Sequence, residues 1–214
     1  MKNIKILTLL MKGKIITIEG IDGSGKSTIT EALVEKLNRK LERKIIKTKE
    51  PTDSWLGNSV RKGLRKNIDP LAEAFLFTAD HIEHIEKEIK PHLDKKRIVI
   101  SDRYSDSFYA YQGATLAQNR SIKNPIKYLK NLRKDFTIKP DLTIFLDVSP
   151  RTAMERLGED KIKFENLEFQ KKVYENFERI IEEERDRFLV VDGEKAKDDV
   201  INQIMDSIEL KINF

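Results

Sequence analysis

The chain has 214 residues, of which 39% are hydrophobic and 36% charged, with a formal net charge of +5 and no cysteine. A chain of this length can bury one sizeable core. It contains no run of 18 apolar residues of the kind that could cross a membrane. The lack of cysteine excludes disulfides and thiolate metal sites, and three scattered histidines argue against a zinc cluster. We therefore expect one cytoplasmic domain over residues 1–214.

The positive net charge has two interpretations. It suits polyanionic ligands. However, abundant charged residues of both signs, lysine and glutamate among them, equally suit the surface of a heat-adapted protein. We favour the second interpretation, so the charge is not evidence for a nucleic-acid partner or a membrane surface.

The first predicted element follows an N-terminal extension, residues 1–12, in which Met11 is a second candidate start. β-branched residues are nearly continuous from Lys14 to Glu19, as expected for a parallel strand that is covered on both faces and lies at the sheet centre. The next segment reads Gly20-Ile21-Asp22-Gly23-Ser24-Gly25-Lys26-Ser27-Thr28. It fits G-x-x-x-x-G-K-[ST], the pattern of a phosphate-binding P-loop, and the strand before it and the helix after it disfavour a chance match.

The chemistry of this loop predicts a nucleotide site. Its glycines let backbone N–H groups turn toward phosphate oxygens, and the N-terminus of the following helix attracts the same anions. Lys26 is expected to reach the β and γ phosphates, and the Ser27 hydroxyl a magnesium ion. We therefore predict that residues 20–28 bind ATP.

Strands and helices are predicted to alternate along the rest of the chain. Further strands are predicted at residues 44–48, 97–101, 142–146 and 188–191. Helices are predicted at residues 26–42, 54–65, 70–90, 105–118, 125–136, 149–157, 167–187 and 198–212. The apolar stripe expected of the helix at 70–90 is Leu71, Phe75, Ala79, Ile82, Ile85 and Ile89. The alternation predicts an α/β protein of the P-loop NTPase fold, a five-stranded parallel sheet flanked by helices, with a short lid at 158–165.

Polar residues follow the second and third predicted strands. Glu50 comes after one, and Asp102 and Arg103 come after the other. Because ligands bind outside the carboxyl ends of parallel strands, these residues should lie near the loop. We expect Asp102 to act with Ser27 at the magnesium ion through water, although capping of the next helix is the alternative. The planar fork of Arg103 suits a phosphate.

Ordered segments of the chain resemble the thymidylate kinase family, P-loop enzymes that phosphorylate dTMP with ATP. They are IEGIDGSGKST, KEPT at 49–52, GNSVRKGL at 57–64, AEAFLFTADH at 72–81, SDRYSDSFYAYQGA at 101–114 and KPDLTIFLDVSP at 139–150. The likeness runs from about Met11 to the C-terminus, and DRY followed by AYQG is its most specific part. The resemblance implies ATP-dependent phosphorylation of dTMP to dTDP with Mg²⁺, by a homodimer.

The resemblance also implies site residues. The acceptor site comprises Asp22, Glu50, Pro51, Arg61, Phe77, His81, Arg103, Ser107, Phe108, Tyr111 and Gln112. The catalytic residues are Lys26, Asp102, Arg103, Arg156 and Lys163. Phe77 would stack on the base, and Tyr111 would close the deoxyribose side, where a 2′-hydroxyl should clash. Core packing is the alternative for these two aromatic residues, and a plain surface position is the alternative for Arg61 and Arg156.

Two departures from the family pattern affect the site. Relatives that have no arginine in the P-loop carry one in the lid, but here the lid has none and the loop has Gly23 where the other subtype has arginine. Lys163 is the best replacement, and Lys161 the second. His81 stands where an arginine usually bonds the thymine, and Phe108 where a small or polar residue is usual. We therefore expect weaker base discrimination and a pH-dependent contact from His81, unless it is a helix-surface histidine.

Two rival functions remain open at this point. One is a kinase for another nucleoside monophosphate or for a deoxynucleoside. The other is a P-loop ATPase switch that controls a partner or nucleic acid. The acceptor-side residues argue against the switch, as does the lack of a basic stripe interleaved with exposed aromatic side chains.

Overall fold

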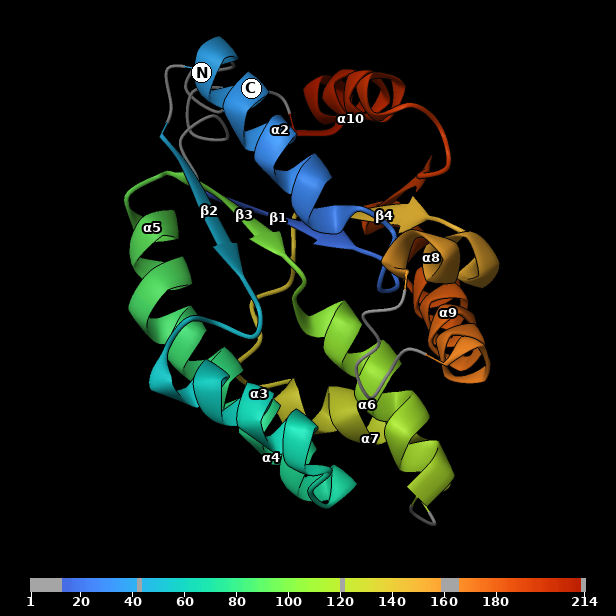
Figure 1. The fold of residues 1–214 in the computed structure, drawn as a ribbon. Coiled ribbons are helices and arrows are strands. Elements are labelled where there is room, and N and C mark those ends of the chain that lie inside the picture. Colours follow the sequence, from blue (N-terminus) through green and yellow to red (C-terminus); the bar gives the residue numbers. More distant parts are fainter. Residues whose placement is uncertain (1–12, 42–43, 120–121, 159–165, 213–214) are drawn as a thin grey trace.

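The computed structural model describes residues 13–41, 44–119, 122–158 and 166–212. Its strands form one parallel sheet in the order β2-β3-β1-β4-β5 (Figure 1). Their bounds are Lys14–Glu19 for β1, Ile45–Lys49 for β2, Ile98–Asp102 for β3, Leu142–Asp147 for β4 and Phe188–Asp192 for β5. The predicted fold class and the central position of β1 are confirmed.

Helices connect the strands and cover both faces of the sheet (Figure 1). The α-helices are α2 (Lys26–Lys40), α3 (Trp55–Lys66), α4 (Pro70–His84), α5 (Lys90–Asp94), α6 (Ser105–Asn119), α7 (Pro125–Arg133), α8 (Pro150–Leu157), α9 (Leu167–Glu183) and α10 (Lys197–Ile212). A π-helical segment, Ile85–Ile89, joins α4 to α5, and a 3₁₀ turn, Arg185–Arg187, precedes β5. None of the helices within these described stretches is both long and apolar enough to span a bilayer.

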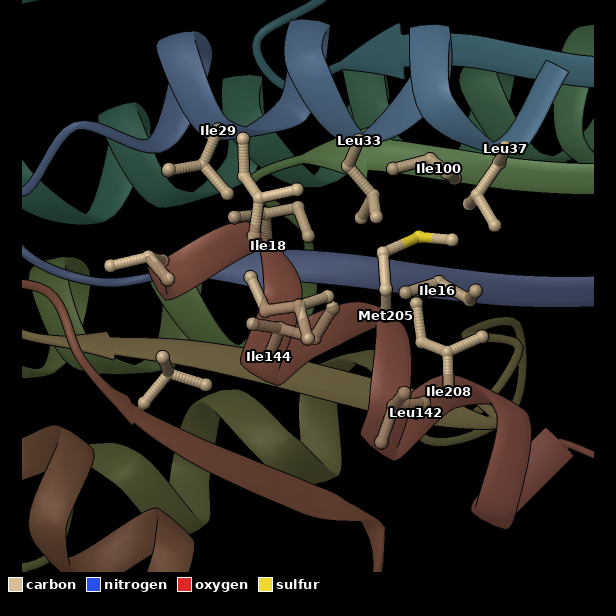
Figure 2. Packing of buried hydrophobic residues seen from close by; sticks show 14 of the residues in the cluster. Ile16, Ile18, Ile29, Leu33, Leu37, Ile100, Leu142, Ile144, Met205 and Ile208 are labelled. Carbon is tan, nitrogen blue, oxygen red and sulfur yellow. The ribbon is translucent and has the colours of Figure 1, made fainter. Parts of the chain in front are cut away.

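The alternation of side chains along β1 divides the core into two layers. Ile16 and Ile18 point toward α2 and α10, where they meet Leu33 and Ile208 (Figure 2). The opposite face of the sheet packs against α6, α7 and α9 through a second, more aromatic cluster that includes Phe145. Because a parallel strand is buried on both faces, its sequence is apolar almost throughout, which is why the bounds of β1 match the prediction.

The apolar stripe that we predicted for the helix at 70–90 is wrong for α4. Phe75 is 49% exposed and Ile82 37% exposed, whereas the polar Asp80, His81 and His84 are buried. The buried polar side chains all have hydrogen-bond partners, so their desolvation is offset. Apolar spacing therefore identified the helix, but tertiary partners decided which face of it is buried.

The first turn of α6 is held by a buried ion pair. Arg187 donates from Nη1 and Nη2 to the two carboxylate oxygens of Asp106, at 2.7 Å each. A two-bond pair of this kind fixes orientation as well as distance. It anchors the start of the helix that carries Ser107, Phe108 and Tyr111.

Candidate active site

The segment Gly20–Thr28 turns from the end of β1 into α2. Gly25 precedes the helix with φ of +89°, a conformation that favours glycine. Gly23 also has a positive φ, and a Cβ there would lie 2.2 Å from the carbonyl oxygen of Ala153 in α8. The loop therefore passes too close to α8 for any side chain at position 23.

Lys26 is buried and curls back over this loop. Its Nζ donates to the Ile21 carbonyl at 2.6 Å and to Ser24 Oγ at 3.3 Å. Burial, together with the charge of Arg103, lowers the pKa of Lys26 to about 7. The ammonium thus lies within the turn of the loop, and negative charge added there would raise its pKa.

Ser27 and Asp102, the predicted magnesium residues, are in direct contact. Ser27 Oγ donates to Asp102 Oδ2 at 2.6 Å, so the end of β3 meets the first turn of α2. A hydroxyl and a carboxylate are the hard oxygen donors that Mg²⁺ takes, usually with water and phosphate oxygens filling its other positions. Among the described residues there is no cluster of three or more His, Cys, Asp or Glu side chains that could hold a metal ion.

Arg103 reaches across the loop from a left-handed backbone conformation, φ +66°. Such a conformation is costly outside glycine, and it persists here because the Arg103 N–H donates to the Ile18 carbonyl at 3.0 Å. The guanidinium forms an ion pair with Asp22 and donates to Ser107 Oγ at 3.1 Å. Burial alone would raise the pKa of Asp22, but the charges of Arg103 and Lys26 lower it.

Glu19 organises this region, although sequence analysis treated it only as the last residue of a strand. Its side chain is fully buried, where Oε1 accepts the Tyr104 N–H at 3.0 Å and Oε2 accepts the Ser107 hydroxyl. Burial and the nearby Asp106 carboxylate raise the pKa of Glu19 to about 8. Glu19 therefore orients the serine that in turn contacts Arg103. A carboxylate in an otherwise apolar strand was the available signal.

Replacing Glu19 with glutamine should change how stability depends on pH. Between about pH 4.5 and pH 8 the unfolded carboxyl is ionised while the folded one keeps its proton, so the free energy of unfolding falls as pH rises. Glutamine mimics the protonated form and does not titrate. Relative to the parent, Glu19→Gln should gain on the order of a few kcal/mol of stability between pH 5 and pH 8. Denaturant unfolding of both proteins at several pH values measures this difference, and parallel curves would contradict it.

A cavity of about 140 Å³ opens beside Arg103. Its walls are Asp22, Glu50, Pro51, Leu64, Phe77, Arg103, Tyr104, Ser107, Phe108, Tyr111 and Gln112. Every predicted acceptor residue except Arg61 and His81 is among them. The rings of Phe77 and Phe108 lie 6.3 Å apart, and the Tyr111 hydroxyl accepts the Asp22 N–H at 2.8 Å. Leu64 and Tyr104 are wall residues that sequence analysis missed.

A second cavity, of about 410 Å³, joins this one to the P-loop. Arg61 lines it together with Lys26 and Asp102. The Arg61 guanidinium donates to the backbone carbonyls of Pro51 and Thr52, and its side chain is 31% exposed. The structure thus places Arg61 beside the same cavity as the P-loop rather than leaving it as a plain surface arginine.

The predicted contact between His81 and the base is not supported by its position. His81 is fully buried and does not line the cavity, so it is not a surface histidine either. Its Nδ1 lies 2.8 Å from Glu50 Oε1 and its Nε2 lies 3.0 Å from Thr137 Oγ1. Burial lowers the pKa of His81, which keeps it neutral near pH 7. Both ring nitrogens of His81 are therefore already engaged. The contact with Glu50 arises because a buried carboxylate requires hydrogen-bond donors.

Glu50 itself faces both cavities. It accepts hydrogen bonds from Nδ1 of His81 and from Nδ1 of His84, the latter at 2.9 Å. Burial alone would raise the pKa of Glu50, but the two histidines hold it below its ordinary value. Glu50 is therefore a carboxylate held in place by two histidines, and it lines both cavities.

Arg156 lies on the other side of the P-loop. It donates to the Gly193 carbonyl at 3.0 Å, and with Ser24 and Thr28 it lines a cavity of about 200 Å³. Gly193 and Lys195 also line this cavity, and neither was predicted from the sequence. The predicted lid cations Lys163 and Lys161 lie outside the described residues.

The fold and the loop together define a P-loop NTPase-type α/β protein with an aromatic-lined cavity beside the loop. Comparison with known proteins narrows this class. A family model described as thymidylate kinase matches residues 18–204. The chain is 43% identical over 200 residues to a protein of Methanococcoides burtonii named "Probable thymidylate kinase", covering 92% of this chain and 97% of that one.

Proteins of the same name from two other organisms are also similar to the chain. The one from Methanosarcina acetivorans is 45% identical over 201 residues, covering 92% of this chain and 96% of that one. The one from Natronomonas pharaonis is 44% identical over 196 residues, covering 91% and 97%. The chain belongs to the thymidylate kinase family, and it is a kinase.

Proposed function

We propose that this protein transfers the γ-phosphoryl group of ATP to dTMP and forms dTDP. The observation that carries the proposal is the continuity of the two cavities, because Asp22, Glu50, Pro51 and Arg103 line both of them. One cavity contains the P-loop lysine and the other is aromatic. A donor phosphate and an acceptor nucleotide could therefore meet at Arg103. The family and the names of its relatives support the same reaction.

On the donor side, residues 20–28 would bind the ATP phosphates through backbone N–H groups. Lys26 would release the Ile21 carbonyl and follow the transferred phosphoryl group, stabilising its charge. Ser27 and Asp102 would hold Mg²⁺, which neutralises charge on the phosphates. Arg156, and Lys163 within a lid at 158–165, would add positive charge from the opposite side, and lid closure would exclude water.

On the acceptor side, Arg103 and Arg61 would bind the monophosphate. Arg103 already faces this space, paired with Asp22, so phosphate binding would share or exchange that partner. Asp22 and Glu50 would lie near the sugar 3′-hydroxyl. Phe77 would stack on the base, with Phe108, Ser107 and Gln112 forming the wall beside it.

A panel of nucleotide acceptors assayed with ATP tests the proposal. Tyr111 is packed against the cavity with its hydroxyl bonded to the loop, so it leaves little room for a 2′-hydroxyl. We expect kcat/KM to be greater for dTMP and dUMP than for UMP, and greater for pyrimidine than for purine monophosphates. A greater kcat/KM for UMP would contradict the sugar assignment. ATP hydrolysis with no phosphorylated acceptor would favour the ATPase switch instead.

We also propose that the protein is a homodimer and acts in the cytoplasm, where its proposed nucleotide substrates are used. Three large apolar side chains are exposed on the packed pair α3 and α4: Trp55 at 73%, Phe75 at 49% and Ile82 at 37%. Exposed aromatic and aliphatic groups on neighbouring helices are typical of an interface between copies. This surface supports self-association.

A further inference from the structure

Arg133, the last residue of α7, is a fully buried arginine that forms no hydrogen bond to a carboxylate of the described residues. Its Nε donates to Thr78 Oγ1 at 3.2 Å, and its Cζ lies 3.3 Å from the centroid of the Phe108 ring. Within the described part of the chain, neither of its terminal nitrogens has a hydrogen-bond partner. One face of the guanidinium is thus covered by an aromatic ring, while four N–H bonds in its plane are unsatisfied.

This arrangement is unfavourable unless something else accepts those N–H bonds. Burial lowers the pKa of Arg133 only to about 10, so the group stays charged near neutral pH. A cation–π contact offsets part of the desolvation, but a buried charge normally needs hydrogen-bond acceptors as well. An apolar side chain would fill the same space at lower cost. The missing acceptor is therefore a clue to a ligand.

Arg133 lies behind the aromatic wall of the acceptor cavity, although it does not itself line that cavity. Phe108, which it stacks on, lines that cavity, and Thr78 follows the cavity residue Phe77 on α4. The charge of Arg133 also acts on Tyr104, a third wall residue. Arg103 and Ser107 line the other, phosphate-side part of the wall. Both ring nitrogens of His81 are engaged by Glu50 and Thr137, whereas Arg133, directly behind Phe108, has terminal N–H groups with no acceptor among the described residues.

We propose that Arg133 is the residue that recognises the polar edge of the acceptor base, its terminal N–H groups donating to the 4-carbonyl oxygen of thymine or uracil. The inference rests on the proposed function. This contact requires the ring of Phe108, which lies between Arg133 and the cavity wall, to turn aside when the base enters. Cytosine carries an amino group at the same position, which cannot accept these bonds. A charged hydrogen bond of this kind corresponds to roughly a 10- to 100-fold preference.

The test combines a protein change with a matched ligand change. The acceptors are dTMP and its analogue in which hydrogen replaces the 4-oxygen, the 5-methyl-2-pyrimidinone deoxynucleotide. The variants are Arg133→Met, which keeps apolar bulk, and Lys130→Met from the same helix as control, since Lys130 pairs with Glu183 on the surface. We expect the parent and the control to prefer dTMP by roughly 10- to 100-fold in kcat/KM. Arg133→Met should remove that preference by lowering kcat/KM for dTMP while leaving kcat/KM for the analogue and the KM for ATP unchanged.

Equal losses on both acceptors would show that Arg133 acts only through packing, and would overturn the proposal. If Arg133→Met does not fold, isotope-edited infrared spectra of the parent with dTMP labelled at C4 provide a second measurement. A 4-carbonyl band shifted to lower frequency than in aprotic solvent is expected, and an unshifted band would overturn the proposal. Failure to phosphorylate any pyrimidine deoxynucleotide would refute the proposed function itself, whereas equal use of dTMP and the analogue would refute only the role of Arg133.

Discussion

Lys26→Ala should reduce kcat by roughly 100- to 1,000-fold while the protein stays folded. The side chain is buried at the carboxyl edge of the sheet, and its present partners are the Ile21 carbonyl and Ser24 Oγ. A transferred phosphoryl group would compete for the same ammonium, and charge that develops in the transition state is stabilised most by a donor already in place. Alanine leaves no buried carboxylate without a partner, because Asp22 keeps Arg103.

The measurement is steady-state turnover with saturating ATP and dTMP, with circular dichroism to confirm the fold. Arg39→Ala is a matched control, since Arg39 lies on the same helix in an exposed pair with Glu35. The control should keep its activity. Near-normal turnover in folded Lys26→Ala would disprove the assignment of this loop as the phosphate site.

Arg103→Ala should lower kcat/KM for dTMP by roughly 10- to 100-fold, mainly through KM for the acceptor, with little change in KM for ATP. The guanidinium faces both cavities and offers a fork that fits a phosphate monoester. The same change also removes the cation beside Asp22, so the pKa of that carboxyl should rise and stability should fall.

The double variant Asp22→Asn/Arg103→Ala separates these two effects. Removing both charges eliminates the uncompensated carboxylate, so stability should return toward that of Asp22→Asn alone. The kcat/KM for dTMP should stay low, because the proposed phosphate contact is still missing. Recovery of acceptor KM together with stability would show that Arg103 acts only by neutralising Asp22.

Much of the donor side could be predicted because its signals are local. A strand that is buried on both faces, a glycine-rich turn and a helix start each depend on residues close in sequence. The helix predicted from residue 54 shows the same locality, because Ser54 accepts the N–H groups of Leu56 and Gly57 at its start. The pairing of Ser27 with Asp102 follows from the rule that parallel strand ends meet at one edge.

The base end of the acceptor site could not be predicted in the same way. Sequence spacing placed His81 on a helix near Phe77, but it could not show that the His81 imidazole would hydrogen-bond to Glu50. Arg133 sits among other basic residues of α7, and nothing in that pattern distinguishes it from the exposed ones. Burial is a property of what packs against a side chain, so it appears only when distant segments are brought together.

The sequence by itself determined the order of the strands and helices, the phosphate loop and the set of polar residues at the strand ends, because these depend on short-range periodicity and backbone chemistry. The tertiary structure decided which face of α4 is buried, that Glu19 holds Ser107, and that Arg133 lies against Phe108. These depend on contacts between residues far apart in the chain. A buried polar side chain is stable only beside a partner, and that partner is set by how the elements pack.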